Sequence, residues 1–306
     1  MNICGKEIKI QGRALRVARV AAEGFEFLED PEATLDQLRH CGSRIDLFTF
    51  TQRLPEIKPK YAYPMEWGNA AVLTITTFEN WWKQIGNKTR NCARQAAKKG
   101  VVVRETPFND DLVHGIWRIY NECPIRQGRR FLHYGKDLET VHRITATFLE
   151  RSFFIGAFLG EELIGFMKLT IDEARSQAAV MCNLSMIQHR DKSPTNALIA
   201  QAVQGCEKRG IPHLVYSSFA FGKKRGDSLM DFKKSNGFER VELPRYYVPM
   251  NGWGALALRL GLHHRLADRL PESVAAKLRD ARSAWYKRRF QPSMGMPHEL
   301  KHSEES

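Results

Sequence analysis

The chain has 306 residues, of which 43% are hydrophobic and 26% charged, a composition typical of folded proteins that excludes a disordered or low-complexity chain. Lys and Arg number 47 against 34 Asp and Glu, a formal charge of +13 that favours an anionic partner such as nucleic acid, a lipid surface or a phosphorylated molecule. Zinc-finger and RNA-binding motifs, a signal-peptide pattern and apolar runs of the ~18 residues that a membrane span needs are all missing. The six cysteines lack metal-type or redox-type spacing, so we assign no metal site and expect a reducing, cytoplasmic setting.

The first hundred residues predict a partial α/β unit. Pro31 and Gly42 mark the beginning and end of one helix, and Gly100 marks the end of another. The expected elements, in chain order, are a strand over 16–22, a helix over 31–42, strands over 44–52 and 70–75, and one long helix over 77–100.

Residues 101–250 predict a complete second unit with the element order β-α-α-β-β-β-α-β-α-β. Asn109 is a suitable N-cap for its first helix, and the apolar stretch 153–171 with its Gly-Glu-Glu turn predicts a hairpin. The expected elements are a strand over 101–105, helices over 109–123 and 138–152, the hairpin, a strand over 176–187, a helix over 193–210, a strand over 213–221, a helix over 226–238 and a strand over 239–250. We therefore expect an α/β (α+β) fold with a mixed sheet flanked by helices and domains over 1–100 and 101–250.

Residues 251–306 predict a basic helical tail. Between 259 and 289 there are nine basic and three acidic residues, and the apolar stripe of 252–270 suits either docking on the protein or an anionic membrane interface. The second possibility would place the protein at the inner membrane surface.

Several stretches of the second unit resemble a known superfamily. The basic helix and strand over 89–105, the segment Phe232-Lys233 followed by Gly237-Phe238, and the element order resemble GNAT acetyltransferases, in particular the FemAB-like group of acyl and aminoacyl transferases. The resemblance covers about residues 85–250. It implies a GNAT-like sheet, acyl transfer without a covalent enzyme intermediate, and acyl-CoA as a co-substrate rather than a permanently bound cofactor.

The resemblance places the donor phosphates at the beginning of the helix over 193–210. There Ser193 is the expected N-cap and Pro194 the first helical residue, and such a helix end attracts anions. The family pattern of Arg or Gln followed by two glycines has Arg190, Ser193 and Thr195 here, so both glycines are replaced. The expected donor-binding residues are Arg190, Lys192, Ser193, Thr195 and Asn196. An ordinary capped helix is the alternative.

Two further basic stretches are candidates for substrate binding. Arg90 and Arg94 share one face of the helix over 77–100, where the alternative is a solvated surface. The loop over 124–137 corresponds to the acceptor-covering loop of GNAT folds and offers Arg126, Gln127, Arg130 and Tyr134 for binding and His133 for proton transfer.

Catalytic candidates follow the strand over 213–221. Tyr216 or Ser218 is suited to protonating the leaving group. Lys233 is suited to stabilising the oxyanion, as its place in the Phe-Lys segment implies, and Asp231 is a further candidate. The alternative for Lys233 is a surface helix lysine. Cys182 lies in an expected buried strand, where cysteine usually packs as a small apolar residue.

The sequence predicts an N-acyltransferase that acts on an amine of a small, anionic or sugar-linked acceptor. Aminoacyl-tRNA and acyl carrier protein are alternative donors, each suited to a basic chain. The alternative from another class is a non-catalytic protein that binds a membrane surface.

Overall fold

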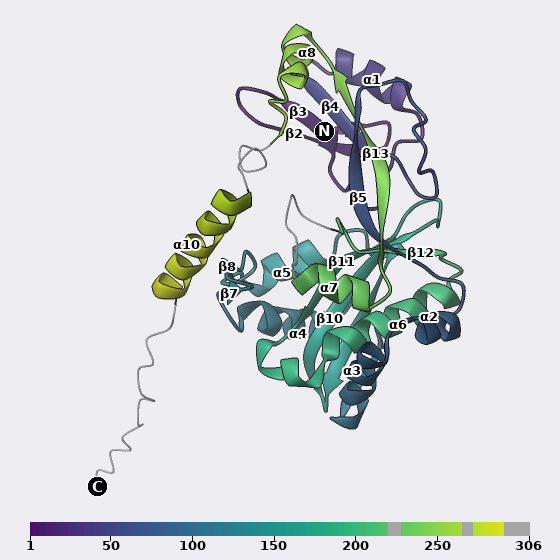
Figure 1. Ribbon diagram of the computed structural model, residues 1–306, viewed down its shortest axis with the longest axis vertical. Helices are drawn as coiled ribbons and strands as arrows, with labels where there is room; N and C mark the ends of the chain where they lie inside the picture. Colours follow the sequence, from purple (N-terminus) through teal and green to yellow (C-terminus); the bar gives the residue numbers. More distant parts are fainter. Residues whose placement is uncertain (220–227, 265–271, 291–306) are drawn as a thin grey trace.

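The computed structural model describes residues 1–219, 228–264 and 272–290. In this part of the chain eleven strands form one mixed sheet in the order β1-β2-β3-β4-β13-β5-β12-β11-β10-β9-β6, and β7 pairs with β8 (Figure 1). The strands are β1 (Asn2–Ile3), β2 (Lys6–Gln11), β3 (Val17–Val20), β4 (Leu47–Thr51), β5 (Met65–Thr74), β6 (Val101–Thr106), β7 (Ile125–Arg126), β8 (Arg129–Arg130), β9 (Ser152–Leu159), β10 (Glu162–Ile171), β11 (Ala178–Ser185), β12 (His213–Val215) and β13 (Glu239–Pro249). The α-helices are α1 (Pro31–His40), α2 (Phe78–Gln84), α3 (Asn87–Lys98), α4 (Asp110–Asn121), α5 (Leu138–Thr145), α6 (Pro194–Lys208), α7 (Ser228–Ser235), α8 (Gly252–Arg259) and α10 (Glu272–Phe290), and the 3-10 helices are η1 (Leu149–Arg151) and η2 (Ile187–Lys192).

Two long strands join the two ends of the sheet. The last strand, β13, pairs antiparallel with both β4 and β5, and β5 continues the sheet by pairing with β12. The parallel pairs are β3–β4 and β11–β12. The expected α/β fold with a mixed sheet is therefore confirmed, while the domain boundaries stay a prediction.

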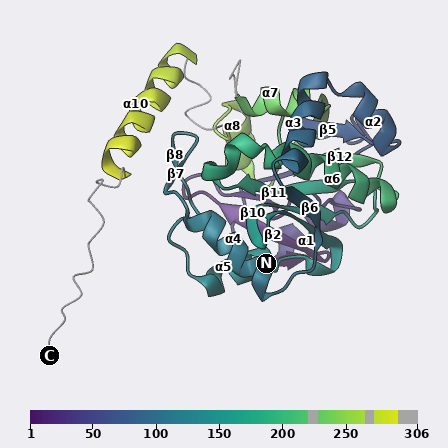
Figure 2. The ribbon, with the colours of Figure 1, turned by 90° about the horizontal axis from the view of Figure 1, so that it is seen from below.

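Apolar side chains bury both faces of the β12–β6 end of the sheet. One face packs against α2, α3 and α6, and the opposite face packs against α4 and α5 (Figure 2). Because β9 and β10 lie between these layers, nearly every residue of Glu162–Ile171 is buried, which explains the continuous apolar run in the sequence. A separate aromatic cluster around Phe50 and Tyr246 fills the β1–β4 end under α1.

Most of the expected elements occur at their expected places, but several have other bounds. The helix expected over 138–152 ends at Thr145, the strand expected over 70–75 begins at Met65, and the loop expected over 124–137 contains the β7–β8 hairpin. The helix over 77–100 is two helices, because the chain is extended at Ile85, where the buried side chain joins the core, and at Gly86. The strand over 213–221 is shorter, and its last two residues lie outside the described residues. The β1–β2 hairpin has no counterpart in the expected elements.

The tail begins with a helix that packs on the sheet. The indole of Trp253 donates a hydrogen bond to the carbonyl of Ala14 (3.0 Å), and Gly254 approaches the backbone of Asp46 so closely that no side chain fits there. Residues 265–271 and 291–306 of the expected tail lie outside the described residues. Among the described helices, none has the length and apolar character required to cross a membrane.

Candidate functional site

The candidate site lies where two parallel strands separate. β11 and β12 pair only at Ala178–Leu214 and Ala179–Val215. The chain that follows β12 stays beside β5 instead, because the backbone N–H of Tyr216 donates a hydrogen bond to the carbonyl of Ala71 (2.8 Å). Beyond Ala179, no strand in the described residues pairs with this edge of β11, so its backbone groups face the gap between the two strands.

A β-bulge helps to turn β11 away from β12. Lys168 of β10 pairs with Cys182 and Leu169 pairs with Val180, so Met181 is left without a partner. An extra residue of this kind bends a strand and increases its twist. After the bulge, Cys182 lies with the α4 side of the sheet and Asn183 pairs with Met167 of the α6-side core.

Tyr216 lies on the β12 side of the separation. Its hydroxyl hydrogen-bonds to the side chain of Asn183, so one residue from each strand meets across the gap. Burial raises the pKa of Tyr216 to about 12, which keeps the phenol protonated at neutral pH. The amide oxygen of Asn183 is buried and has no hydrogen-bond partner within the part of the chain that the structure describes. Ser217 has a left-handed backbone (φ 50°), a conformation that occurs often at functional sites.

The side chain of Lys233 of α7 points toward Tyr216, at the separation of β11 and β12. Its side chain is only 1% exposed, its ammonium donates to the carbonyl of Ser218 (2.6 Å), and Nζ lies 4.8 Å from the centre of the Tyr216 ring. This excludes the alternative of a surface lysine. Asp231 is exposed on α7, so the structure does not bring it to Lys233.

A buried asparagine connects α7 with α6. Asn236 is fully buried, accepts a bond from the amide of Asn196 (3.3 Å), and accepts another at its carbonyl from the indole of Trp81 (2.9 Å). The expected donor-binding end of α6 is therefore in direct contact with the residue that follows the helix carrying Lys233.

A polar group also lies on the α4 side of the sheet. The hydroxyl of Tyr120 donates to the sulfur of Cys182, and the ring of His133 stacks on Tyr120 with centroids 4.5 Å apart. Burial raises the pKa of Cys182 to about 12, so the thiol is protonated and unsuited to nucleophilic attack. Burial, together with the charge of Lys136, lowers the pKa of His133 and favours its neutral form.

No protein-family model and no curated protein matches the sequence. The structure resembles FemX, with a TM-score of 0.57 and 10% identity over 78% of this chain and 83% of that one. It also resembles the C-terminal DUF2156 domain of a putative lysylphosphatidylglycerol synthetase from Agrobacterium fabrum (TM-score 0.53, 16% identity, 82% of both chains) and L-PGS from Bacillus licheniformis (0.52, 13%, 83% and 85%).

The fold is GNAT-like, in the FemAB-like arrangement. The resemblance expected from the sequence is thus confirmed at the level of the fold, which is all that identities of this size show.

The donor-binding candidates of the GNAT-like fold lie together at the beginning of α6. Arg190 is exposed, and Lys192 contacts Asp191 (3.4 Å). Ser193 is the N-cap residue, but its side chain makes no capping bond and its backbone is left-handed, with φ 54°. Thr195 and Asn196 are partly buried in the first turn of the helix.

We expect Ser193→Gly to raise the free energy of unfolding by about 0.5–1 kcal/mol. A side chain in the left-handed conformation costs about 1–2 kcal/mol, and the larger freedom of glycine in the unfolded chain offsets part of the gain. Urea unfolding measures the difference, with Ser43→Gly as the control at a position where φ is not left-handed. A loss of stability would show that contacts of the Ser193 side chain outweigh the backbone strain.

Arg126 joins three parts of the site rather than facing solvent. Its guanidinium donates to the carbonyls of Ser185 (2.7 Å) and Ile119 (2.8 Å) and to the carboxylate of Glu122 (2.9 Å). Glu122 in turn accepts from the backbone of Ile187 (2.7 Å), so this pair fixes the end of β11 to α4. Burial lowers the pKa of Arg126, and the nearby charge of Arg190 adds to this effect.

The other substrate-binding candidates do not form one group. Gln127 lies at the turn of the β7–β8 hairpin, while Arg130 and Tyr134 are exposed in the same segment. Arg90 bonds to the carbonyl of Trp82 (3.2 Å) and Arg94 lies over the Trp82 ring, so both pack α3 against α2, apart from the hairpin (Figures 1 and 2).

Proposed function

We propose that the protein is an N-acyltransferase that moves an acyl group from an activated donor to an amine of a small, anionic or sugar-linked acceptor. The observation that carries this proposal is the separation of β11 from β12, with Tyr216 and Lys233 at its edge. Protonated phenol and buried ammonium groups at an open strand edge match what acyl transfer needs, which is positioning, an acid and a positive charge.

The donor is proposed to lie along the free edge of β11. A donor with an extended, amide-containing arm would form hydrogen bonds with this edge, as an added strand does. The phosphates of that donor would then reach the first turn of α6, near Arg190 and Lys192. Arg126 is already paired with Glu122 (2.9 Å), so the exposed Arg190 is the arginine proposed to meet these phosphates. Acyl-CoA has the required shape and charge and is the leading donor.

In the proposed reaction the uncharged amine attacks the acyl carbonyl directly. The new C–N bond forms, the bond to the leaving thiol or hydroxyl breaks, and the amine loses one proton to solvent or to His133. Tyr216 gives its proton to the leaving group and regains one from water. The charge of Lys233 stabilises the oxyanion that develops during attack.

An aminoacyl ester of tRNA is the second candidate donor. Ser193 and Thr195 replace the two glycines of the family pattern, which hinders close approach of a pyrophosphate. A phenol with pKa about 12 also protonates an alkoxide more readily than a thiolate, whose thiol has an ordinary pKa of ~8.5. The likeness to a domain of a putative lysylphosphatidylglycerol synthetase, whose name indicates transfer of a lysyl group, and the charge of +13 agree with this donor.

A donor panel tests the proposal. Purified protein is incubated with amino sugars and, in separate reactions, with short-chain and long-chain acyl-CoA or with charged tRNA. Thiol release and loss of label from tRNA report the two donors separately. Turnover with one donor class supports the proposal and identifies the donor. If neither donor is consumed across the acceptor panel, acyl transfer is contradicted and surface binding becomes the better hypothesis.

We expect Tyr216→Phe to lower kcat about 100-fold with whichever donor is used. Loss of a positioned acid typically costs this much or more, while the lost hydroxyl removes only about 1 kcal/mol of stability. Initial rates measure the first effect and thermal unfolding the second. The control is Tyr61→Phe, in the aromatic cluster near β4, which should keep full activity. Unchanged kcat in Tyr216→Phe would remove this residue from the reaction.

A further inference from the structure

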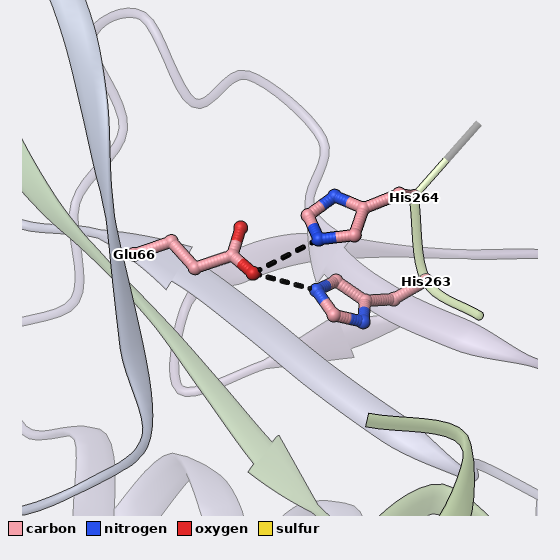
Figure 3. A group of neighbouring side chains, drawn as sticks. All are labelled: Glu66, His263 and His264. Atoms are coloured by element: carbon pink, nitrogen blue, oxygen red, sulfur yellow. Dashed lines mark hydrogen bonds and ion pairs between the residues drawn. The ribbon is translucent and has the colours of Figure 1, made fainter. Parts of the chain in front are cut away.

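A side chain of β5 meets two adjacent histidines from a distant part of the sequence. Glu66 lies near the beginning of this strand, and His263 and His264 follow α8 (Figure 3). One carboxylate oxygen of Glu66 lies 2.9 Å from Nε2 of His263 and 3.1 Å from Nε2 of His264. This group lies outside the β11–β12 separation and has no part in the proposed reaction.

The three groups converge as the ligands of one ion do. Their ligand atoms all lie within 4.8 Å of one another. Zinc binds imidazole nitrogen at about 2.0–2.1 Å and carboxylate oxygen at about 2.0–2.2 Å, so its tetrahedral ligand atoms lie roughly 3.4 Å apart. The two distances from the Glu66 oxygen, 2.9 and 3.1 Å, are somewhat shorter than this value. Small side-chain movements would therefore open a position between Glu66 and the two imidazoles.

Neighbouring contacts support the orientation of these ligands. The hydroxyl of Tyr247 hydrogen-bonds to Glu66, and its ring lies against His263 with centroids 4.7 Å apart. The side chain of His263 is 4% exposed, so its position is fixed, whereas those of His264 and Glu66 are 43% and 41% exposed. The buried ligand gives rigidity, and the exposed ones leave a path by which an ion and water enter.

One carboxylate oxygen accepts two hydrogen bonds, so two imidazole N–H donors are the alternative to an ion at Glu66. The convergence of three ligand atoms from two parts of the chain also matches a bound cation. We propose that Glu66, His263 and His264 form a divalent-cation site, for which Zn²⁺ is the best match. Two histidines and one glutamate are a ligand set used for zinc, with further positions open to water or to an anionic group. The ion would tie the chain after α8 to β5.

One feature of His263 limits the expected affinity. Its Nδ1 is buried without a hydrogen-bond partner in the described residues. A metal at Nε2 puts the ring proton on Nδ1, where no acceptor receives it. Missing support of this kind typically weakens metal binding 10- to 100-fold. We therefore expect binding weaker than at a fully supported site with the same ligands.

The test is a Co²⁺ titration of the chelator-stripped full chain, followed by displacement with Zn²⁺. We expect one Co²⁺ to bind per chain. The bound Co²⁺ should absorb visible light as expected for nitrogen and oxygen ligands, without a thiolate charge-transfer band. His264→Gln and Glu66→Gln should each weaken binding at least tenfold. His213→Gln is the matched control, because this partly buried histidine bonds to the carbonyl of Ser176 (3.0 Å) and lies outside the cluster.

A second measurement is independent of spectroscopy. Zn²⁺ should raise the melting temperature of the wild type and of His213→Gln, and this shift should be lost in His264→Gln. Because His264 and Glu66 are partly exposed, their variants should fold, and circular dichroism checks this. The proposal is overturned if the wild type binds no stoichiometric Co²⁺, or if both variants bind it as the wild type does. Neither result bears on acyl transfer.

Discussion

Replacing Lys233 by methionine is expected to lower turnover about 100- to 1000-fold and the free energy of unfolding by about 1–3 kcal/mol. The ammonium is buried, lies 4.8 Å from the Tyr216 ring and donates to the carbonyl of Ser218. Methionine has a similar length but carries no charge, so the oxyanion loses its stabilising group and the carbonyl of Ser218 loses this donor.

The neighbouring lysine provides the control for this prediction. Lys234 is exposed on the same helix, so Lys234→Met should leave both turnover and stability unchanged. Initial rates and urea unfolding of the two variants separate the roles of Lys233. If Lys233→Met is less stable but keeps full turnover, the lysine only holds the chain after β12 in place. If turnover falls while stability holds, its main role is catalytic.

The burial of Lys233 shows what the sequence predicts and what it does not. Its Phe-Lys segment resembles the FemAB-like group, so the residue is found from the sequence. A lysine in a short helix is, however, expected at the surface, and only packing against Tyr216 and Ser218 reveals its burial. The same holds for Arg126, which the sequence places in a loop and the structure places between α4 and β11.

The fold is largely predictable because its signals are local. Asn109 caps α4 and accepts from the backbone of Leu112 (3.0 Å), and Pro31 opens α1, both as the sequence indicates. The break between α2 and α3 has no such local signal, since no proline marks it. The backbone is extended at Ile85 and Gly86, and the side chain of Ile85 is buried in the core. Tertiary packing therefore determines this break, and the periodicity of the sequence does not reveal it.

Contacts between residues from distant parts of the sequence are the features that the sequence predicts least well. Asn183 gives one local signal, since a polar residue interrupts the apolar stretch 178–187. Its contact with Tyr216 depends on how β11 leaves β12. Glu66 and His263 are separated by most of the chain, and their contact arises because α8 packs beside β13, which pairs with β5. No spacing rule joins residues that meet only through the sheet.

The described part of the tail exposes three apolar side chains on one helix. Val274, Leu278 and Trp285 are exposed on α10 and lie four and seven residues apart, so they share one face of the helix. The opposite face meets the β7–β8 hairpin, where Ser283 lies near Gly128 (Figure 1). The apolar face therefore points away from the protein.

Basic residues flank this apolar face on both sides. Arg282 and Arg289 lie along one side, and Lys277 and Arg288 lie along the other, all four exposed. Each basic residue near an anionic leaflet contributes about 1 kcal/mol, so four contribute about 4 kcal/mol at low salt. Insertion of three apolar side chains adds to this attraction and resists salt.

We expect the full chain to bind vesicles that contain anionic lipid and to release them as salt is raised. Leu278→Ser with Trp285→Ser should reduce binding at least tenfold, because burial of two large side chains is lost. The matched control is Ile57→Ser with Leu132→Ser, since these side chains are also exposed but lie outside α10. Vesicle sedimentation at increasing salt gives the affinities.

These point variants keep α8, whose Gly254 packs against Asp46, so they test α10 without removing a part of the folded sheet. If the control variant loses binding as much as the α10 variant does, the attraction comes from the overall charge of +13 and not from this helix. If the wild type does not bind anionic vesicles at low salt, the predicted contact of α10 with lipid is wrong. Release by salt alone, with the α10 variant unimpaired, would show that the basic residues act without insertion of Leu278 and Trp285.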